Sequence, residues 1–373
     1  MTAASARRFG TASLLAVAAF IVTPAAAQRI DNSYICVFKP GAVASSAVAG
    51  EANRAAQSQG GAVTHSYTTA IRGFSANISA QGVANMQGRN PNIAYCEQDQ
   101  VMRIPQPAAG RPGGGGGSSG QQIPWGVTRV HGGVANASGR AWIIDTGIDG
   151  THPDLTVNAG LSRNFSSGTS WKDGNGHGSH VAGIVGARNN SIGVVGVAPG
   201  VELVAVRVLN NAGSGTTSGV IAGVDYVAQV AGGTGVANMS LGGGVSTALD
   251  DAVLGAAATG VKFVLAAGNE ADNVANHSPA RANGPNVYTL SAFGQGSGGG
   301  DYWATFSNYG AGIDYAEPGV SILSTYKGGG YATLSGTSMA APHLAGLLLL
   351  GAVRNDGTVT NDPDSFREPI GVH

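Results

Sequence analysis

Short apolar runs alternate with helical segments from residue 123 onward, and this alternation constrains the fold more than any other feature of the chain. Five runs rich in Val, Ile, Leu and Ala have the length of buried strands: 141–144, 203–208, 236–239, 262–266 and 287–292. Four segments favour helices: 178–187, 219–230, 248–259 and 339–350. Strands buried on both faces read as continuous apolar runs, so the pattern predicts an α/β fold whose parallel sheet is covered by helices on both faces.

Three residues with complementary chemistry lie at the ends of these elements. Asp145 closes the first apolar run in AWIIDTG, His177 lies in the glycine-rich segment DGNGHGSHVAG, and Ser338 lies in the small-residue turn LSGTSMAAPH before an apolar helix. A serine hydroxyl is a weak nucleophile and needs a general base that is itself oriented by a third group. The chain therefore supplies a candidate acid, base and nucleophile in the order Asp, His, Ser.

Other patterns are weaker. The 61 glycines produce accidental motifs: 116–120 matches G-x-S-x-G and 294–299 matches G-x-G-x-x-G, yet both lie in Gly/Ser-rich stretches without the strand and helix that these motifs require. His177 and His180 form an H-x-x-H pair that lacks the H-E-x-x-H spacing of a zinc helix, so a metalloprotease is not favoured. We expect His180 and His343 to be structural.

The three local contexts, in this order, resemble those of the subtilisin-like serine proteases, the subtilases of peptidase family S8. Further segments look like family segments in family order: NMSLGG, AAGNE, FSNYG and EPG, which begin at residues 238, 266, 306 and 317. The resemblance implies a subtilisin-like fold and peptide-bond hydrolysis through Asp145, His177 and Ser338. It also implies that Asn269 donates its side-chain amide to the oxyanion. Seen alone, each residue would be an ordinary turn or N-cap residue.

The same resemblance assigns the substrate groove. Four consecutive residues would pair with the substrate backbone: Ser240, Leu241, Gly242 and Gly243. The opposite wall of the pocket would contain Ala266 and Gly268. Because both walls are small or apolar, we expect an apolar or aromatic substrate residue before the cut. Glu270 at the rim would also tolerate a basic substrate residue there.

Two segments, NHSPA at 276–280 and WGVTRV at 125–130, look most like the proteinase K branch of the family, which binds calcium. By that resemblance the ligands would be the backbone carbonyls of Pro285 and Val287 and the carboxylate of Asp314, which are the oxygen ligands that calcium prefers. An empty site is the alternative. No organic cofactor is expected.

The N-terminus predicts export. Residues 1–27 contain a basic pair, an apolar stretch shorter than a bilayer span and a small-residue cleavage pattern, as in a signal peptide. We therefore expect a secreted or periplasmic protein without stable membrane association. With 11% charged residues and a net charge of −1, the chain has no basic field for nucleic acid.

Residues 28–104 follow the order βαββαβ, which predicts a ferredoxin-like α+β domain. It resembles the inhibitory I9-type propeptide of subtilases, a chaperone and inhibitor. The two cysteines, Cys36 and Cys96, fall on its first and last strands, which are neighbours in such a sheet, and a disulfide is expected, with free thiols as the alternative. A Gly/Pro/Ser-rich flexible linker at 105–122 then leads into the catalytic domain, 123–373.

These observations predict a secreted, monomeric serine endopeptidase that acts on polypeptides and is made as a precursor that cuts itself within the linker. The alternatives are a catalytically dead relative that only binds peptides and a non-peptide hydrolase that uses the same triad. The polar tail, 355–373, lacks the helices that the family commonly adds. We expect the core to be slightly open at that edge, or the tail to pack there in irregular form.

Overall fold

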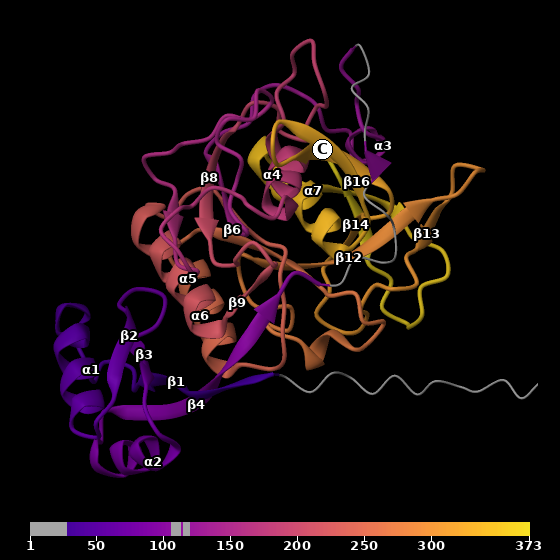
Figure 1. The fold of residues 1–373 in the computed structure, drawn as a ribbon. Coiled ribbons are helices and arrows are strands. Elements are labelled where there is room, and N and C mark those ends of the chain that lie inside the picture. Colours follow the sequence, from indigo (N-terminus) through magenta and orange to yellow (C-terminus); the bar gives the residue numbers. More distant parts are fainter. Residues whose placement is uncertain (1–27, 106–112, 115–119) are drawn as a thin grey trace, which may run out of the picture.

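The computed structural model describes residues 28–105, 113–114 and 120–373. Figure 1 shows a small N-terminal unit, in indigo, beside a larger unit that contains the rest of the described chain. The predicted signal peptide and most of the predicted linker lie outside the described residues. No helix within the described ranges is long and apolar enough to cross a membrane.

The N-terminal unit has the predicted element order. Its elements are β1 (Arg29–Phe38), η1 (Ser45–Ala47), α1 (Val48–Gln57), β2 (Ala62–Tyr67), β3 (Gly73–Asn77), α2 (Ala80–Arg89) and β4 (Ile93–Arg103). The strands pair antiparallel in the order β2-β3-β1-β4. Side chains alternate along β1, so Cys36 and Phe38 pack with the unit's own helices, whereas Ile35 and Val37 pack against the larger unit.

A disulfide closes the N-terminal unit, as expected from the sequence. Cys36 and Cys96 stand opposite each other in β1 and β4 and are bonded. The bond joins residues 60 positions apart. A loop of that length restricts the unfolded chain enough to stabilise the unit by about 4 kcal/mol in the chain-entropy description.

A largely parallel sheet forms the centre of the larger unit and contains all five predicted strands. Its parallel strands are β7 (Arg163–Asn164), β8 (Glu202–Arg207), β6 (Arg140–Asp145), β10 (Val236–Met239), β11 (Lys262–Ala266), β12 (Val287–Gln295), β14 (Tyr315–Pro318) and β18 (Pro369–Val372), in that spatial order. Two antiparallel strands, β13 (Asp301–Trp303) and β17 (Arg354–Thr358), extend it.

The four predicted helices cover the two faces of this sheet. They are α4 (His177–Gly186), α5 (Thr217–Val230), α6 (Thr247–Ala257) and α7 (Thr337–Leu350). Trp142 and Ile144 of β6 pack with α5 and α6, whereas Ala141 and Ile143 pack with α4 and α7. The continuous apolar run in β6 is therefore explained by burial on both faces.

Short elements complete the unit: β5 (Gly113–Gly114), α3 (Trp125–Arg129), β9 (Ser214–Thr216), η2 (Val274–Asn276), β15 (Ile322–Tyr326) and β16 (Gly330–Leu334). The glycine run in the predicted linker is not wholly irregular, because β5 pairs antiparallel with β16. Two glycines have no side chains to pack, so their pairing rests on backbone hydrogen bonds that composition does not predict.

The expectation of an open edge or an irregular tail was wrong. The tail forms a hairpin of β17 and β18, and β18 adds a parallel strand beside β14. Ile370 and Val372 are buried against Phe293 and Trp303, which provides the apolar contact that holds the strand at the sheet edge. Only two apolar side chains alternate in this strand, too few to distinguish it from a loop in the sequence.

Candidate active site

The predicted triad residues come from three different elements of the larger unit. Asp145 is the last residue of β6, His177 is the first residue of α4, and Ser338 is the second residue of α7. A strand end and two helix starts meet at the carboxyl edge of the parallel sheet, where functional groups are expected. His177 and Ser338 line one cavity of about 160 Å³.

Asp145 and His177 form a buried hydrogen-bonded pair. Nδ1 of His177 lies 2.9 Å from Oδ1 and 3.0 Å from Oδ2 of Asp145. Oδ1 of Asp145 also accepts a hydrogen bond from the Thr146 backbone N–H at 2.6 Å. The carboxylate is fully buried. Its hydrogen bond to Nδ1–H holds the imidazole in one orientation and leaves Nε2 for chemistry.

Burial and the neighbouring carboxylates shift the pKa of His177 in opposite directions. Burial alone lowers the pKa, but the charge and hydrogen bond of Asp145, and then the charge of Asp173, raise it above the ordinary value. Asp173 is held by hydrogen bonds from the turn that precedes α4, including those from the Asn175 and Gly176 backbone N–H groups at 2.8 Å. Sequence reasoning did not single out Asp173.

The hydroxyl of Ser338 points toward the substrate strand in this conformation. Its Oγ donates to the carbonyl of Ser240 at 3.3 Å, and Oγ of Ser240 donates to the carbonyl of Ser338 at 2.9 Å. Within the described part of the chain, the Ser338 hydroxyl is not hydrogen-bonded to His177 in this conformation. Catalytic hydrogen bonds often tighten only when substrate is bound, and rotation about one side-chain bond moves the hydroxyl.

Asn269 is oriented by the residue before the serine. Its Oδ1 accepts hydrogen bonds from both the backbone N–H and the side-chain hydroxyl of Thr337, each at 2.9 Å. With Oδ1 so engaged, Nδ2 is the group that serves as a donor on the other side of the amide. Gly336 leaves room for it, because a Cβ at that position would lie 3.0 Å from Nδ2.

The predicted substrate strand already pairs with a peptide backbone, that of the N-terminal unit. The Arg103 N–H donates to the Gly242 carbonyl at 3.0 Å, and the Gly242 N–H donates to the Arg103 carbonyl at 2.9 Å. On its other side, β4 pairs antiparallel with β9, and the Ile104 N–H donates to the carbonyl of Gly213 at 3.1 Å. The end of β4 is thus the middle strand of a three-stranded arrangement, and Pro105 reaches the cavity that contains Ser338.

The other predicted groove residues lie around this strand. Leu241 is fully buried, and Gly243 pairs with Ser278 through two backbone hydrogen bonds of 3.0 and 3.3 Å. In the opposite wall, Ala266 is the last residue of β11, and the Gly268 N–H donates to the hydroxyl of Thr337 at 3.1 Å. The wall is therefore tied directly to the start of α7.

The two other histidines named from the sequence are buried and structural in geometry. Nε2 of His180 lies 3.1 Å from the carbonyl of Ile322 and 3.0 Å from that of Ala332. Burial lowers the pKa of His180 to about 3, and it lowers the pKa of His343 to about 4. With pKa values this low, both rings are neutral at ordinary pH.

The predicted calcium ligands come from the start of β12 and from the residue before β14. Val287 is the first residue of β12, and Pro285 lies in the turn that precedes it. Oδ2 of Asp314 accepts from the Thr289 N–H, two residues after Val287 in β12, at 2.8 Å. The donor set fits an oxygen-binding cation, with one carboxylate oxygen engaged by the backbone.

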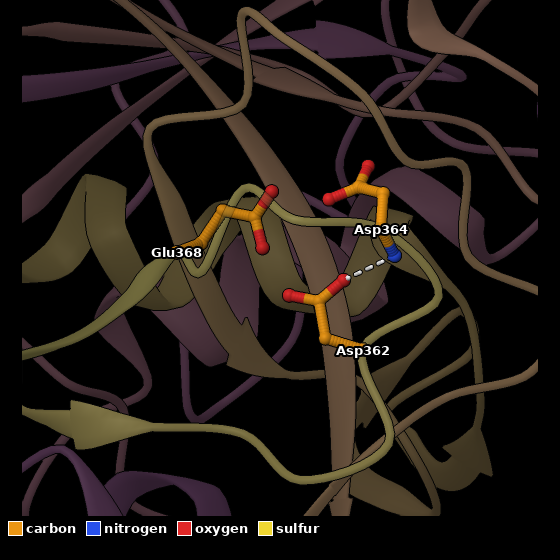
Figure 2. Close-up of side chains that lie close together, drawn as sticks. All are labelled: Asp362, Asp364 and Glu368. Atoms are coloured by element: carbon orange, nitrogen blue, oxygen red, sulfur yellow. Dashed lines mark hydrogen bonds between the residues drawn. The ribbon is translucent and has the colours of Figure 1, made fainter.

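Sequence reasoning missed a second group of acids in the tail. Asp362, Asp364 and Glu368 lie close together in the loop before β18 (Figure 2). Burial, followed by the neighbouring Asp362 and Asp364, raises the pKa of Glu368 to about 8. The spacing D-x-D-x-x-x-E was the available sequence signal.

Comparison with known proteins gives consistent matches. The family model of the subtilase family matches residues 142–362. Alkaline serine exoprotease A of Vibrio alginolyticus is 40% identical over 293 residues, which are 75% of this chain and 51% of that protein, so the chain spans about half the length of this relative. M-protease of Shouchella clausii (strain KSM-K16) is 40% identical over 299 residues, 78% of this chain and 71% of that protein. The crystal structure of a cold adapted subtilisin-like serine proteinase has a TM-score of 0.54 and 44% identity, and the match covers 61% of this chain and 83% of that one.

Proposed function

Because the chain belongs to the subtilase family of serine endopeptidases, we propose that it is a secreted enzyme made as a self-inhibited precursor, in which Asp145, His177 and Ser338 hydrolyse peptide bonds. One observation carries the proposal. The end of β4 pairs on both edges as a substrate would and leads Pro105 into the cavity of His177 and Ser338.

The triad divides the work as its geometry suggests. Ser338 Oγ attacks the peptide carbonyl, and Nε2 of His177 takes its proton and later gives it to the leaving amine. Asp145 holds the ring by Nδ1 at 2.9 Å and stabilises the imidazolium that forms. General base help of this kind contributes about 10² to 10⁴ in rate.

The oxyanion of the tetrahedral intermediate needs donors that are already in place. Asn269 supplies its side-chain amide and Ser338 its backbone N–H at the start of α7. The hydrogen bonds of Thr337 to Oδ1 of Asn269 support this role, because they orient the amide before the substrate binds. Preorganised donors cost no reorganisation at the moment of reaction.

The N-terminal unit acts as the inhibitor and as the chaperone of the larger unit. Asp99 accepts hydrogen bonds from the backbone N–H and hydroxyl of Ser218 at 3.1 and 2.6 Å at the start of α5. Glu97 accepts from Ser246 and from the Ala248 N–H at the start of α6. Carboxylates at helix starts satisfy unpaired N–H groups and favour the helices, which supports a role in folding.

Maturation follows from where the chain enters the cavity. We propose that the precursor cuts itself within residues 105–122, since Pro105 is the first of these residues and already lines the cavity. The released enzyme is proposed to act as a monomer on polypeptides outside the cytoplasm.

Substrate preference follows from the pocket walls. The walls contain Ala266, Gly268 and the strand 240–243, all small or apolar, so we propose cleavage after apolar or aromatic residues. Glu270 is partly exposed at the rim, and its Oε2 accepts from Nδ2 of Asn308 at 2.8 Å. Its negative charge would allow a basic substrate residue at this position. A peptide library cleaved only after basic residues overturns this preference.

Calcium is proposed to bind the carbonyls of Pro285 and Val287 and the carboxylate of Asp314. The bound ion would supply no chemistry to the triad. It would join the start of β12 to the loop before β14 and stabilise this region by mass action.

The deciding experiment compares the intact masses of the secreted wild-type protein and Ser338→Ala. We expect the wild type to lose its N-terminal unit through the linker and Ser338→Ala to retain it. If both chains are trimmed alike, another protease performs the maturation. Wild-type protein that binds peptides without cutting them identifies a catalytically dead relative, and cleavage of esters without cleavage of casein identifies a non-peptide hydrolase.

A further inference from the structure

The most unusual group of side chains outside the active site lies in the C-terminal hairpin. Asp362, Asp364 and Glu368 occupy the loop that leads from β17 into β18, and one carboxylate oxygen of each lies within 4.8 Å of the others. Figure 2 shows the carboxylate of Glu368 pointing toward those of Asp362 and Asp364. Neither the proposed mechanism nor the substrate groove uses these residues.

Glu368 is buried, and its carboxylate makes no hydrogen bond with the described residues that would offset the cost of burial. Its exposed fraction is 3%, and within the described part of the chain neither Oε1 nor Oε2 has a hydrogen-bond partner. Asp362 and Asp364 each add a buried Oδ2 without a partner in the same part of the chain. Burying a charged or polar atom without a partner is unfavourable, so a positive group placed among these four oxygens would stabilise them.

The remaining carboxylate oxygens have a different role. Oδ1 of Asp362 accepts from the Asp364 N–H at 3.2 Å, and Oδ1 of Asp364 accepts from the Phe366 N–H at 2.7 Å. These bonds shape the loop and leave each Oδ2 directed to the cluster. Among the ion pairs of residues 28–105 and 120–373, none involves these three carboxylates.

We propose that Asp362, Asp364 and Glu368 bind a divalent cation, with calcium as the preferred ion. Two Asp oxygens and a bidentate Glu supply four oxygen ligands, and calcium accepts six to eight with flexible geometry, the others coming from carbonyls or water. Magnesium requires near-ideal octahedral geometry, and zinc favours nitrogen and sulfur ligands. This site shares no residue with the one proposed at Asp314.

The position of the site gives the ion a structural role. Glu368 directly precedes β18, the parallel strand that extends the central sheet beside β14. An ion that joins Glu368 to Asp362 and Asp364 holds the loop 362–368 closed and fixes the entry of the chain into the strand. The ion therefore stabilises the sheet edge.

The test measures calcium binding to the full-length Ser338→Ala chain, which removes self-digestion. After removal of metals, equilibrium dialysis counts the bound Ca²⁺ per chain, and thermal unfolding follows the effect of added Ca²⁺. Relative to this parent, we expect Glu368→Gln to bind one Ca²⁺ fewer, or to bind it at least about tenfold more weakly, and to lose part of the calcium-dependent rise in Tm. Any ion at Asp314 is counted in both chains and cancels.

Asp356→Asn is the matched control, because it removes one carboxylate from the same hairpin outside the cluster. It is expected to bind as many Ca²⁺ ions as the parent. The double variant Asp362→Asn, Asp364→Asn provides a second reading if Glu368→Gln does not fold. Equal stoichiometry and affinity in the parent and all cluster variants, or an equal loss in Asp356→Asn, overturns the proposal.

Discussion

At the scale of single residues, His177 is the group on which the pH dependence of the proposed activity rests. The general base must be neutral to accept the proton of Ser338. Asp145 and Asp173 raise the pKa of His177 above its ordinary value of 6.5 against the opposing effect of burial. His177 therefore becomes protonated, and inactive as a base, at a higher pH than an exposed histidine.

For the mature enzyme, we expect kcat/KM to fall as the pH is lowered, with a midpoint above 6.5. In Asp145→Asn the larger of the two charges that raise the pKa of His177 is absent, while burial still lowers this pKa, so the midpoint moves to lower pH. The same variant loses roughly 10⁴ in kcat, because the ring is no longer held in the productive tautomer. Kinetics on a peptide substrate between pH 5 and 9 measure both effects, and an unchanged midpoint contradicts this account of His177.

Asn269 gives a second prediction at this scale. We expect Asn269→Ala to lower kcat by about 10² to 10³ with little change in KM, because the amide acts on charge that develops only in the transition state. Thr337→Ser keeps the hydroxyl that bonds to Oδ1 and serves as the control with nearly normal kcat. Steady-state kinetics separate the two parameters, and a change confined to KM assigns Asn269 to substrate binding.

The sequence made the positions of these residues predictable, but not their conformations. Asp145, His177 and Ser338 follow strand ends or begin helices, so the order of elements alone brings them to one edge of the sheet. The rotation of the Ser338 hydroxyl toward the Ser240 carbonyl depends on a contact between residues 98 positions apart. Asp173 was missed because an Asp-Gly-Asn turn is common without any catalytic neighbour.

At the scale of elements, burial on both faces decided what the sequence could predict. The strands β6, β8, β10, β11 and β12 are short, largely apolar runs that are almost entirely buried, which left little doubt about their type. β18 has only Ile370 and Val372 as apolar side chains to bury, with Pro369 before them and Gly371 between them, and was missed. Its pairing beside β14 depends on side chains from distant parts of the chain, such as Phe293 and Trp303.

The contribution of β18 is testable at Ile370. This side chain is 1% exposed and packs in a cluster with Phe293, Trp303 and Ala316. We expect Ile370→Ala in the Ser338→Ala chain to lower the free energy of unfolding of the larger unit by about 2 to 5 kcal/mol, because the lost methyl groups leave a cavity. Denaturant unfolding at fixed calcium concentration measures the change.

Phe366→Ala is the control from the same hairpin, since Phe366 is 52% exposed. Its free energy of unfolding is expected to change by no more than about 0.5 kcal/mol. Equal stability of Ile370→Ala and the parent would mean that the tail does not pack on the sheet in solution.

At the scale of the whole molecule, the two units are joined by carboxylates that accept hydrogen bonds from the other unit and by the pairing of β4 with β9. In Figure 1 the N-terminal unit lies beside α5 and α6, and β4 continues from it to β9. Ile35 and Val37 of β1 join the hydrophobic core that contains α5 and α6. The order of elements predicted each unit, whereas their contact surfaces carry no local sequence pattern and were not predicted.

Asp225 of α5 makes the most concentrated polar contact between the units. Its carboxylate accepts hydrogen bonds from three consecutive backbone N–H groups, those of Thr68 at 2.9 Å and of Thr69 and Ala70 at 2.7 Å each. In the separated N-terminal unit these N–H groups bond to water. Without Asp225 these groups lose their acceptor in the complex, where Ala70 is buried and Thr68 and Thr69 are partly buried, and a buried N–H group without an acceptor costs about 1 to 3 kcal/mol.

We therefore expect Asp225→Ala to weaken inhibition of the mature enzyme by the released N-terminal unit by roughly two orders of magnitude, about 3 kcal/mol. Alanine favours helices, so α5 itself is retained. Inhibition constants of the separated products of self-processing, measured against a peptide substrate, give the effect. Asp251→Asn tests a single contact for comparison: Asp251 accepts one hydrogen bond, from the Tyr95 hydroxyl at 2.6 Å, at an exposed position, and its loss is expected to change inhibition less than tenfold. If both variants weaken inhibition equally, the inhibitor is held by general charge attraction and not by the triple acceptor at Asp225.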